Sequence, residues 1–137
     1  MFAAYPRGEL FFSIDAATEE TYKKIRKGGN FTLMQKNITR FIEEKAKRNQ
    51  TPPFMVFQFI VMDENVNEAT RFYRFWRDVL VKNKQPVKLV KTLDRLINVA
   101  EYETNLIYFR RKEGPDEERK PSLELQQRVL KELGDEQ

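Results

Sequence analysis

The sequence contains no cysteine and no histidine among its 137 residues. Without cysteine the chain forms no disulfide bond and has no thiolate nucleophile. Without histidine it has no imidazole general base, and the two absences together exclude zinc sites of the Cys/His kind. An iron–sulfur cluster held by this chain's own thiolates is excluded as well, so the sequence predicts no metal site of its own.

Long apolar runs are also missing, because no stretch reaches the length that a membrane-spanning helix needs. The N-terminus has no basic region followed by an apolar core, which is the pattern of a signal peptide. From these two absences we expect a cytoplasmic protein with no membrane partner.

Charge of one sign is not concentrated anywhere in the chain. The formal net charge is +4 and the isoelectric point is about 9.3. The basic residues are spread along the sequence, which is typical of solvated helix faces rather than of a phosphate-binding stripe. We therefore expect no nucleic-acid partner.

Bulky apolar residues are abundant, since hydrophobic residues make up 40% of the chain and 11 residues are phenylalanine. This length and composition predict one domain, residues 1–137, with a core of its own. Apolar runs at 10–14, 54–62 and 105–110 predict strands. Their alternation with helical patterns predicts an α/β fold in which these strands are parallel neighbours in that order, within three layers.

Helix signals separate these strands. Thr18 and Asn30 are suited to be N-caps of helices over residues 18–27 and 31–48, and Gly28 ends the first of them. Asn65 with Glu68 forms the pattern of a capping box for a helix over 66–80. A last helix is expected over residues 122–133.

Residues 86–100 are compatible with two structures. The stretch 86–91 fits a short strand, whereas apolar residues at 89, 93, 96, 97 and 100 fit a helix. We predict a helix over 89–100. We also expect residues 1–9 to form a lead-in loop and residues 111–120 a charged loop.

Polar residues stand at the end of the first strand and within the second. Ser13 and Asp15 are two residues apart and share a face if the strand continues. The strand, polar corner and helix form the arrangement that builds ligand sites at the carboxyl ends of parallel strands. We expect Asp15 to cap the following helix rather than to contact a ligand. Gln58 is a buried amide that requires hydrogen bonds, either from neighbouring backbone or from a ligand in a cavity.

Two stretches of the sequence resemble radical S-adenosylmethionine (SAM) enzymes, in particular the branch with a cysteine-rich C-terminal extension for auxiliary clusters. The first stretch resembles the fourth strand and helix of that family and comprises Phe12-Ser-Ile-Asp15, Thr21-Tyr22, Ile25-Arg26, Gly29-Asn-Phe31 and Asn37-Ile38. The second resembles the fifth unit and comprises Phe57-Gln-Phe-Ile-Val-Met62 with Asn65 and Glu68. The resemblance covers residues 9–67 well and the remainder loosely. It implies the later half of a partial (β/α)6 TIM-like barrel, about strands four to six.

The same resemblance implies a cofactor site. By the family pattern Ser13 contacts SAM, Arg26 pairs with the SAM carboxylate and Gln58 faces the nucleoside. An arginine fork matches a carboxylate, which agrees with that role. The family holds a 4Fe-4S cluster with a CxxxCxxC loop, and this sequence contains no such loop. We therefore expect the chain alone to be inactive and to hold no cluster.

Two function classes follow from these observations. The first is the SAM-binding half of a radical SAM enzyme, either a fragment of it or a subunit completed by a chain that supplies the missing half barrel. The second is a non-catalytic half-barrel interaction or assembly protein derived from such an enzyme. Open sheet edges would favour self-association in either case. The substrate would be determined by parts outside this sequence.

Overall fold

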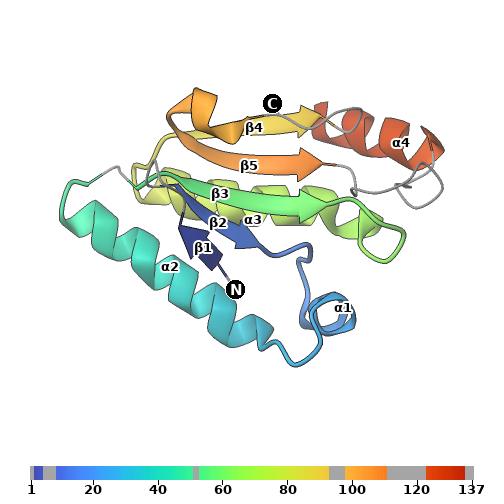
Figure 1. Ribbon diagram of the computed structural model, residues 1–137, viewed down its shortest axis with the longest axis horizontal. Helices are drawn as coiled ribbons and strands as arrows, with labels where there is room; N and C mark the ends of the chain where they lie inside the picture. The colour runs from blue at the N-terminus through green and yellow to red at the C-terminus, as the bar shows by residue number, and fades with distance from the viewer. Residues whose placement is uncertain (1, 5–8, 51–52, 93–97, 111–122, 135–137) are drawn as a thin grey trace.

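The structure, a computed structural model, describes residues 2–4, 9–50, 53–92, 98–110 and 123–134 (Figure 1). The strands are β1 (Phe2–Ala4), β2 (Leu10–Ser13), β3 (Met55–Ile60), β4 (Val87–Thr92) and β5 (Asn105–Arg110). The helices are α1 (Glu19–Ile25), α2 (Phe31–Lys47), α3 (Ala69–Lys82) and α4 (Leu123–Gly134), with short 3-10 turns η1 (Val66–Glu68) and η2 (Val99–Tyr102). The expected charged loop at 111–120 and the start of the last helix at 122 lie outside the described residues.

The strands form one open sheet in the order β1-β2-β3-β5-β4. The strands β2, β3, β5 and β4 are parallel, and only β1 runs antiparallel to its neighbour. In Figure 1 the arrows of these four strands point the same way, toward the edge near α1 and α4. The prediction that strands near 10–14, 54–62 and 105–110 are parallel neighbours in that order is confirmed. The α/β class is confirmed with it, and the sheet does not close into a barrel.

The predicted helix over residues 89–100 is wrong wherever the structure describes it. Residues 89–92 belong to β4, and residues 99–100 begin η2. Residues 93–97 lie outside the described residues. The segment suits either structure by pattern, but its pairing with β5 over six residues satisfies the backbone groups along one of its edges and decides for the strand.

The expected lead-in loop also contains a strand. Residues 2–4 pair with residues 10–12 as β1, which covers one edge of β2. A three-residue strand has no pattern in sequence, because the unpaired backbone of the neighbouring edge supplies its hydrogen bonds.

The connections explain why β4 lies outside β5. The chain passes from β3 through α3 to β4, two positions along the sheet, and then returns by one position to β5. Right-handed crossovers in opposite directions lie on opposite faces of a sheet. Accordingly α3 packs on one face, while Tyr102 of η2 packs on the other against Val56, Val90 and Leu106.

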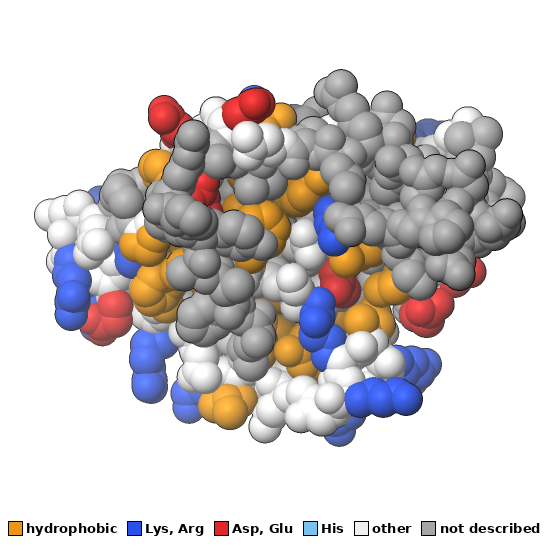
Figure 2. Space-filling view, in the orientation of Figure 1, with side chains coloured by type: hydrophobic (Ala, Val, Ile, Leu, Met, Phe, Trp, Pro, Cys, Tyr) orange, Lys and Arg blue, Asp and Glu red, His pale blue; other side chains and the backbone are white. Residues whose placement is uncertain are grey.

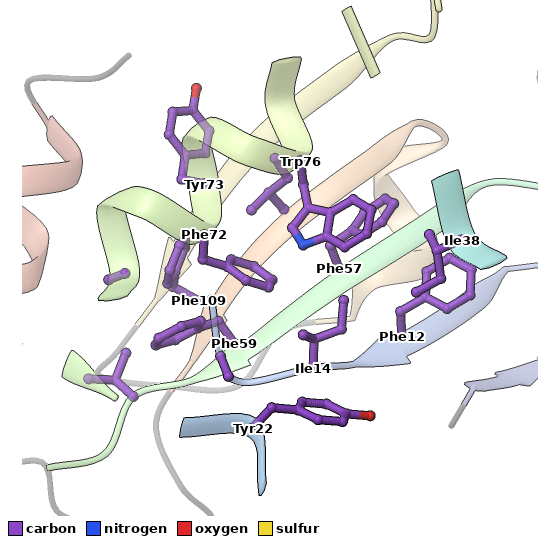
Figure 3. Close-up of a cluster of buried hydrophobic side chains, with 14 of the residues drawn as sticks. Phe12, Ile14, Tyr22, Ile38, Phe57, Phe59, Phe72, Tyr73, Trp76 and Phe109 are labelled. Carbon is purple, nitrogen blue, oxygen red and sulfur yellow. The ribbon is translucent and has the colours of Figure 1, made fainter. Parts of the chain in front are cut away.

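All four α-helices contribute to one hydrophobic cluster on a single face of the sheet. The described α-helices thus form one layer, and the prediction of three layers does not hold for them. Aromatic rings dominate this cluster (Figure 3). Phe57 stacks on Trp76 at 4.8 Å between ring centroids, and Phe59 contacts Phe72 and Phe109 at 5.0 and 5.2 Å. These contacts anchor α3 on the central strands.

The predicted caps of the first two helices are confirmed. The Thr18 hydroxyl accepts a hydrogen bond from the Thr21 amide, and the Asn30 side chain accepts one from the Leu33 amide. Gly28 adopts φ +81° after α1, a left-handed conformation that favours glycine. The two helices therefore begin where the sequence predicts.

None of the described helices combines the length and the apolar character that crossing a membrane requires. On the face shown in Figure 2, the described basic side chains are spread among acidic and apolar ones rather than gathered in a single stripe.

Candidate functional site

A row of polar side chains crosses the sheet at the carboxyl ends of its parallel strands. Ser13 and Gln58 are register partners on β2 and β3, and the Gln58 side-chain amide donates to the Ser13 hydroxyl at 3.2 Å. On β5, Arg110 Nε donates to Gln58 Oε1 at 2.9 Å. Ser13, Gln58 and Arg110 alternate along their strands with the aromatic residues that face the helices. The row therefore lies on the face opposite the α-helices.

Thr92 extends this row to the fourth parallel strand. It is the register partner of Arg110, and its buried hydroxyl has no hydrogen-bond partner among the described residues. We call Ser13, Gln58, Arg110 and Thr92 the polar row. A buried hydroxyl without a partner costs free energy, so Thr92 is the member of the polar row with unused hydrogen-bonding capacity.

Gln58 is not satisfied by neighbouring backbone, the first of the two alternatives that the sequence left open. Its side chain is only 6% exposed, and its hydrogen bonds come from the side chains of Ser13 and Arg110 rather than from backbone. The amide links a hydroxyl on one strand to a guanidinium on another. It thereby holds both groups at one edge of the sheet.

Asp15 is a buried anchor beside the polar row. Its Oδ1 accepts from the Ile60 amide at 2.7 Å and its Oδ2 from Arg26 Nη2 at 2.9 Å. Burial raises the pKa of Asp15, while the Ile60 amide and the Arg26 charge act in the opposite direction. Thr18, not Asp15, caps α1, so the expected capping role of Asp15 is wrong.

Arg26 lies at the C-terminal end of α1 and reaches back toward the carboxyl edge. Its Nη2 binds Asp15, and its buried Nε has no hydrogen-bond partner in the part of the chain that the structure describes. From the sequence we expect Arg26 to lie near Ser13, and both residues do lie at this edge of the sheet. The guanidinium binds Asp15 through Nη2, which leaves its Nε donor for another acceptor.

Glu68 does not form the capping box that its spacing from Asn65 predicts. Its carboxylate accepts from the Ala17 amide at 2.6 Å, from the Thr18 amide and hydroxyl at 3.1 and 2.9 Å, and from the Thr21 hydroxyl. It thus caps the N-terminus of α1 from the next strand–helix unit. A carboxylate at a helix N-terminus is stabilising.

Asn65 ties the same corner together from the other side. Its amide donates to the carbonyls of Asp15 and Ile60 at 3.0 and 2.8 Å, and its oxygen accepts from the Met62 amide at 2.8 Å. It caps nothing in η1. With Glu68, it fixes the loops that follow β2 and β3.

These contacts limit the chemistry that the side chains at the carboxyl edge of the sheet can perform. The carboxylates of Asp15 and Glu68 are held by several donors each, so neither is placed to exchange protons with a substrate. The polar row instead offers a guanidinium, an amide and two hydroxyls, which bind and orient ligands. Within the part of the chain that the structure describes, no cluster of acidic, cysteine or histidine residues could hold a metal ion.

The sequence identifies Ser13, Gln58 and Arg26 as candidate site residues. It does not identify Arg110 and Thr92, the other two members of the polar row. For Arg110 a signal existed, since a charged residue ends an otherwise apolar strand and shares its face with Tyr108. Thr92 could not be found, because its segment was predicted as helix.

No protein-family model, no curated protein and no solved structure matches this chain.

Proposed function

We propose that this chain is the SAM-binding half of a radical SAM enzyme and that its polar row forms part of the cofactor cradle. The observation that carries the proposal is the pair Ser13 and Gln58. They lie side by side on adjacent parallel strands at the carboxyl edge, on the face without α-helices. In β/α barrels that face is the interior and that edge carries the ligand.

The strand arrangement supports the half-barrel part of this proposal. In it, β2, β3 and β5 correspond to strands four, five and six of the family, because they are parallel neighbours in that order. The strand β4 then lies beyond strand six, at the edge where a six-stranded partial barrel is open. The described α-helices cover the outer face, as they do in a barrel.

The residues present are compatible with SAM as a ligand. The Thr92 hydroxyl and Arg26 Nε are buried polar atoms at the carboxyl edge that none of the described residues contacts by a hydrogen bond. Ligand oxygens or nitrogens reaching them would remove the cost of leaving them unpaired. Arg26 would bind the SAM carboxylate, Ser13 would donate or accept through its hydroxyl, and Gln58 would orient the nucleoside.

The iron–sulfur cluster does not fit this chain, which has neither cysteine nor histidine. In the proposal a second chain or segment holds the cluster, and the two cofactors together supply the radical chemistry of the complete enzyme. The part of this chain is to bind and orient SAM and to exclude water from it.

Nuclear magnetic resonance titration of the chain with SAM tests the proposal, because it detects weak binding. We expect low affinity, since losing even a few charge-assisted contacts, about 1.5–3 kcal/mol each, lowers affinity by orders of magnitude. The amide signals of Ser13, Gln58 and Arg26 should shift, and Ser13→Ala should reduce the shifts while keeping the Asp15–Arg26 pair. Shifts confined to other regions, or none at all, would reject the proposal.

A complete enzyme assembled with the partner chain gives a sharper test by calorimetry. Arg26→Ala should weaken SAM binding markedly. Arg40→Ala, at an exposed position on α2, should leave it unchanged. Equal SAM affinity of the two variants would rule out the role of Arg26.

The alternative is a non-catalytic interaction or assembly protein, and the open edge of β4 favours it. Among the described strands, β4 pairs with β5 alone, so its other edge presents unpaired backbone groups. The DNA that flanks the coding sequence discriminates the two functions. An upstream frame with CxxxCxxC supports the enzyme, and its absence supports the interaction protein.

A further inference from the structure

A groove of about 710 Å³ lies between the first turns of α2 and the middle of α3. It is on the helix-covered side of the sheet and shares no lining residue with the polar row, so it is a feature independent of the proposed SAM site. Its lining includes Ala17, Phe31, Gln35, Arg71, Phe75 and Trp76. Its volume is within the range of about 300–1,000 Å³ that small-molecule sites occupy.

The floor and one wall of the groove are aromatic. Phe31 and Trp76 are nearly buried, whereas Phe75 is 37% exposed and is one of the few large exposed hydrophobic residues described. Phe75 packs edge-on against Trp76, with 4.8 Å between ring centroids and 89° between planes. Flat rings held in this way offer a surface on which a further aromatic group can pack.

A positive charge stands beside the aromatic wall. Arg71 precedes Phe75 by one helical turn, so the two side chains are neighbours on α3. Arg71 is exposed, and it forms no ion pair or hydrogen bond with any residue that the structure describes. A guanidinium binds carboxylate, sulfonate or phosphate oxygens through a planar fork of donors.

We propose that this groove binds a small molecule that joins a flat aromatic part to one anionic group. The aromatic part would pack against Phe75 over Phe31 and Trp76, and the anionic group would pair with Arg71. Gln35, half-buried on the opposite wall, would accept or donate one hydrogen bond to the ligand. The positive charge of Arg71 and the aromatic lining of the groove together define this ligand class.

The dye anilinonaphthalene sulfonate is a suitable probe, because it is an aromatic anion that fluoresces in apolar sites. Trp76 is the only tryptophan of the chain and lines the groove, so a dye bound there should accept excitation energy from it. The uncharged analogue N-phenylnaphthylamine separates the contribution of the charge. We expect saturable binding of the dye to the full chain with energy transfer from Trp76.

Variants at exposed positions test which residues form the site. Arg71→Gln should weaken dye binding about tenfold and leave binding of the uncharged analogue unchanged. Phe75→Ala should weaken both compounds. The matched controls are Arg40→Gln and Leu33→Ala, which remove an exposed arginine and an exposed hydrophobic residue of α2 that do not line the groove. Circular dichroism of each variant verifies the fold.

Three results would overturn the proposal. The first is dye binding without saturation or without energy transfer from Trp76. The second is equal dye affinity of the wild type and Arg71→Gln. The third is an equal loss of dye binding in Leu33→Ala and Phe75→Ala, which would show general adsorption to exposed hydrophobic residues.

Discussion

Asp15 shows how one residue at the carboxyl edge combines an unusual backbone with a charged anchor. It adopts φ 61°, in the left-handed region where the backbone of residues other than glycine, asparagine and aspartate is strained. Its carboxylate accepts from the Ile60 amide and from Arg26. Backbone and side chain therefore contribute separately to its effect on stability.

Two substitutions separate these contributions. Asp15→Gly removes the carboxylate but suits the backbone, and we expect it to lower the free energy of unfolding by about 1–3 kcal/mol. Asp15→Ala adds the strain of the left-handed conformation, a further ~1 kcal/mol. Urea unfolding measures both, and an alanine variant as stable as the glycine variant would contradict the role of the backbone.

Lys45 is a buried cation that makes stability depend on pH. Its ammonium donates to the Pro53 carbonyl at 2.6 Å, and its side chain is 3% exposed. Burial lowers the pKa of Lys45 from 10.5 to about 8. Between these two values the unfolded chain binds more protons than the folded chain, so the stability should rise as the pH increases through this window.

Lys45→Met should abolish this rise, which amounts to at most about 3 kcal/mol. The measurement is urea unfolding of wild type and variant at several pH values from neutral to alkaline. Lys47→Met is the control, because Lys47 is exposed and pairs with Glu44 on the surface. If wild type and Lys45→Met gained stability equally with pH, Lys45 would not be the cause.

At the scale of elements, Glu68 links the strand–helix unit of β3 and α3 to the unit of β2 and α1. It occupies the N-cap position of α3, but its side chain makes no capping hydrogen bond there and instead accepts four hydrogen bonds at the start of α1. The short helix α1 spans only seven residues, too few to be stable alone in water. Its N-terminus should therefore depend on this distant carboxylate.

Glu68→Ala should destabilise the protein by about 2–3 kcal/mol, because it leaves the amides of Ala17 and Thr18 without an acceptor. Hydrogen exchange should accelerate most in α1. Glu64→Ala removes an exposed glutamate from the same loop and should change stability by less than about 0.5 kcal/mol. Equal exchange in α1 for the two variants would contradict the proposed cap.

At the scale of the whole molecule, the sheet ends in two edge strands of different length. On one side the three-residue β1 pairs with β2, whereas on the other side β4 has a six-residue edge with no partner among the described strands. Lys88 and Lys91 interrupt its apolar residues, which weakens but does not remove its tendency to pair. Light scattering of the concentrated chain should therefore show self-association. A monomer at all concentrations would contradict this prediction.

The sequence by itself determined the elements whose signals are local. The strands that became β2, β3 and β5, the helices α1 and α2 and the caps Thr18 and Asn30 depend on apolar periodicity and on hydrogen bonds within a few residues. Because the crossover rule is equally general, the parallel order of β2, β3 and β5 could be predicted as well, whereas the register that pairs Ser13 with Gln58 could not.

Only the tertiary structure decided what depends on contacts between distant segments. The segment of β4 suits a helix or a strand, and β5 selected the strand by offering a free edge. By their local sequence, Asp15 and Glu68 could both cap a nearby helix. Instead Asp15 accepts from the Ile60 amide and Glu68 accepts from donors at the start of α1, and these partners are 45 to 51 residues away in the sequence. Thr92 joined the polar row for the same reason, because hydrogen bonds and burial follow proximity in space rather than in sequence.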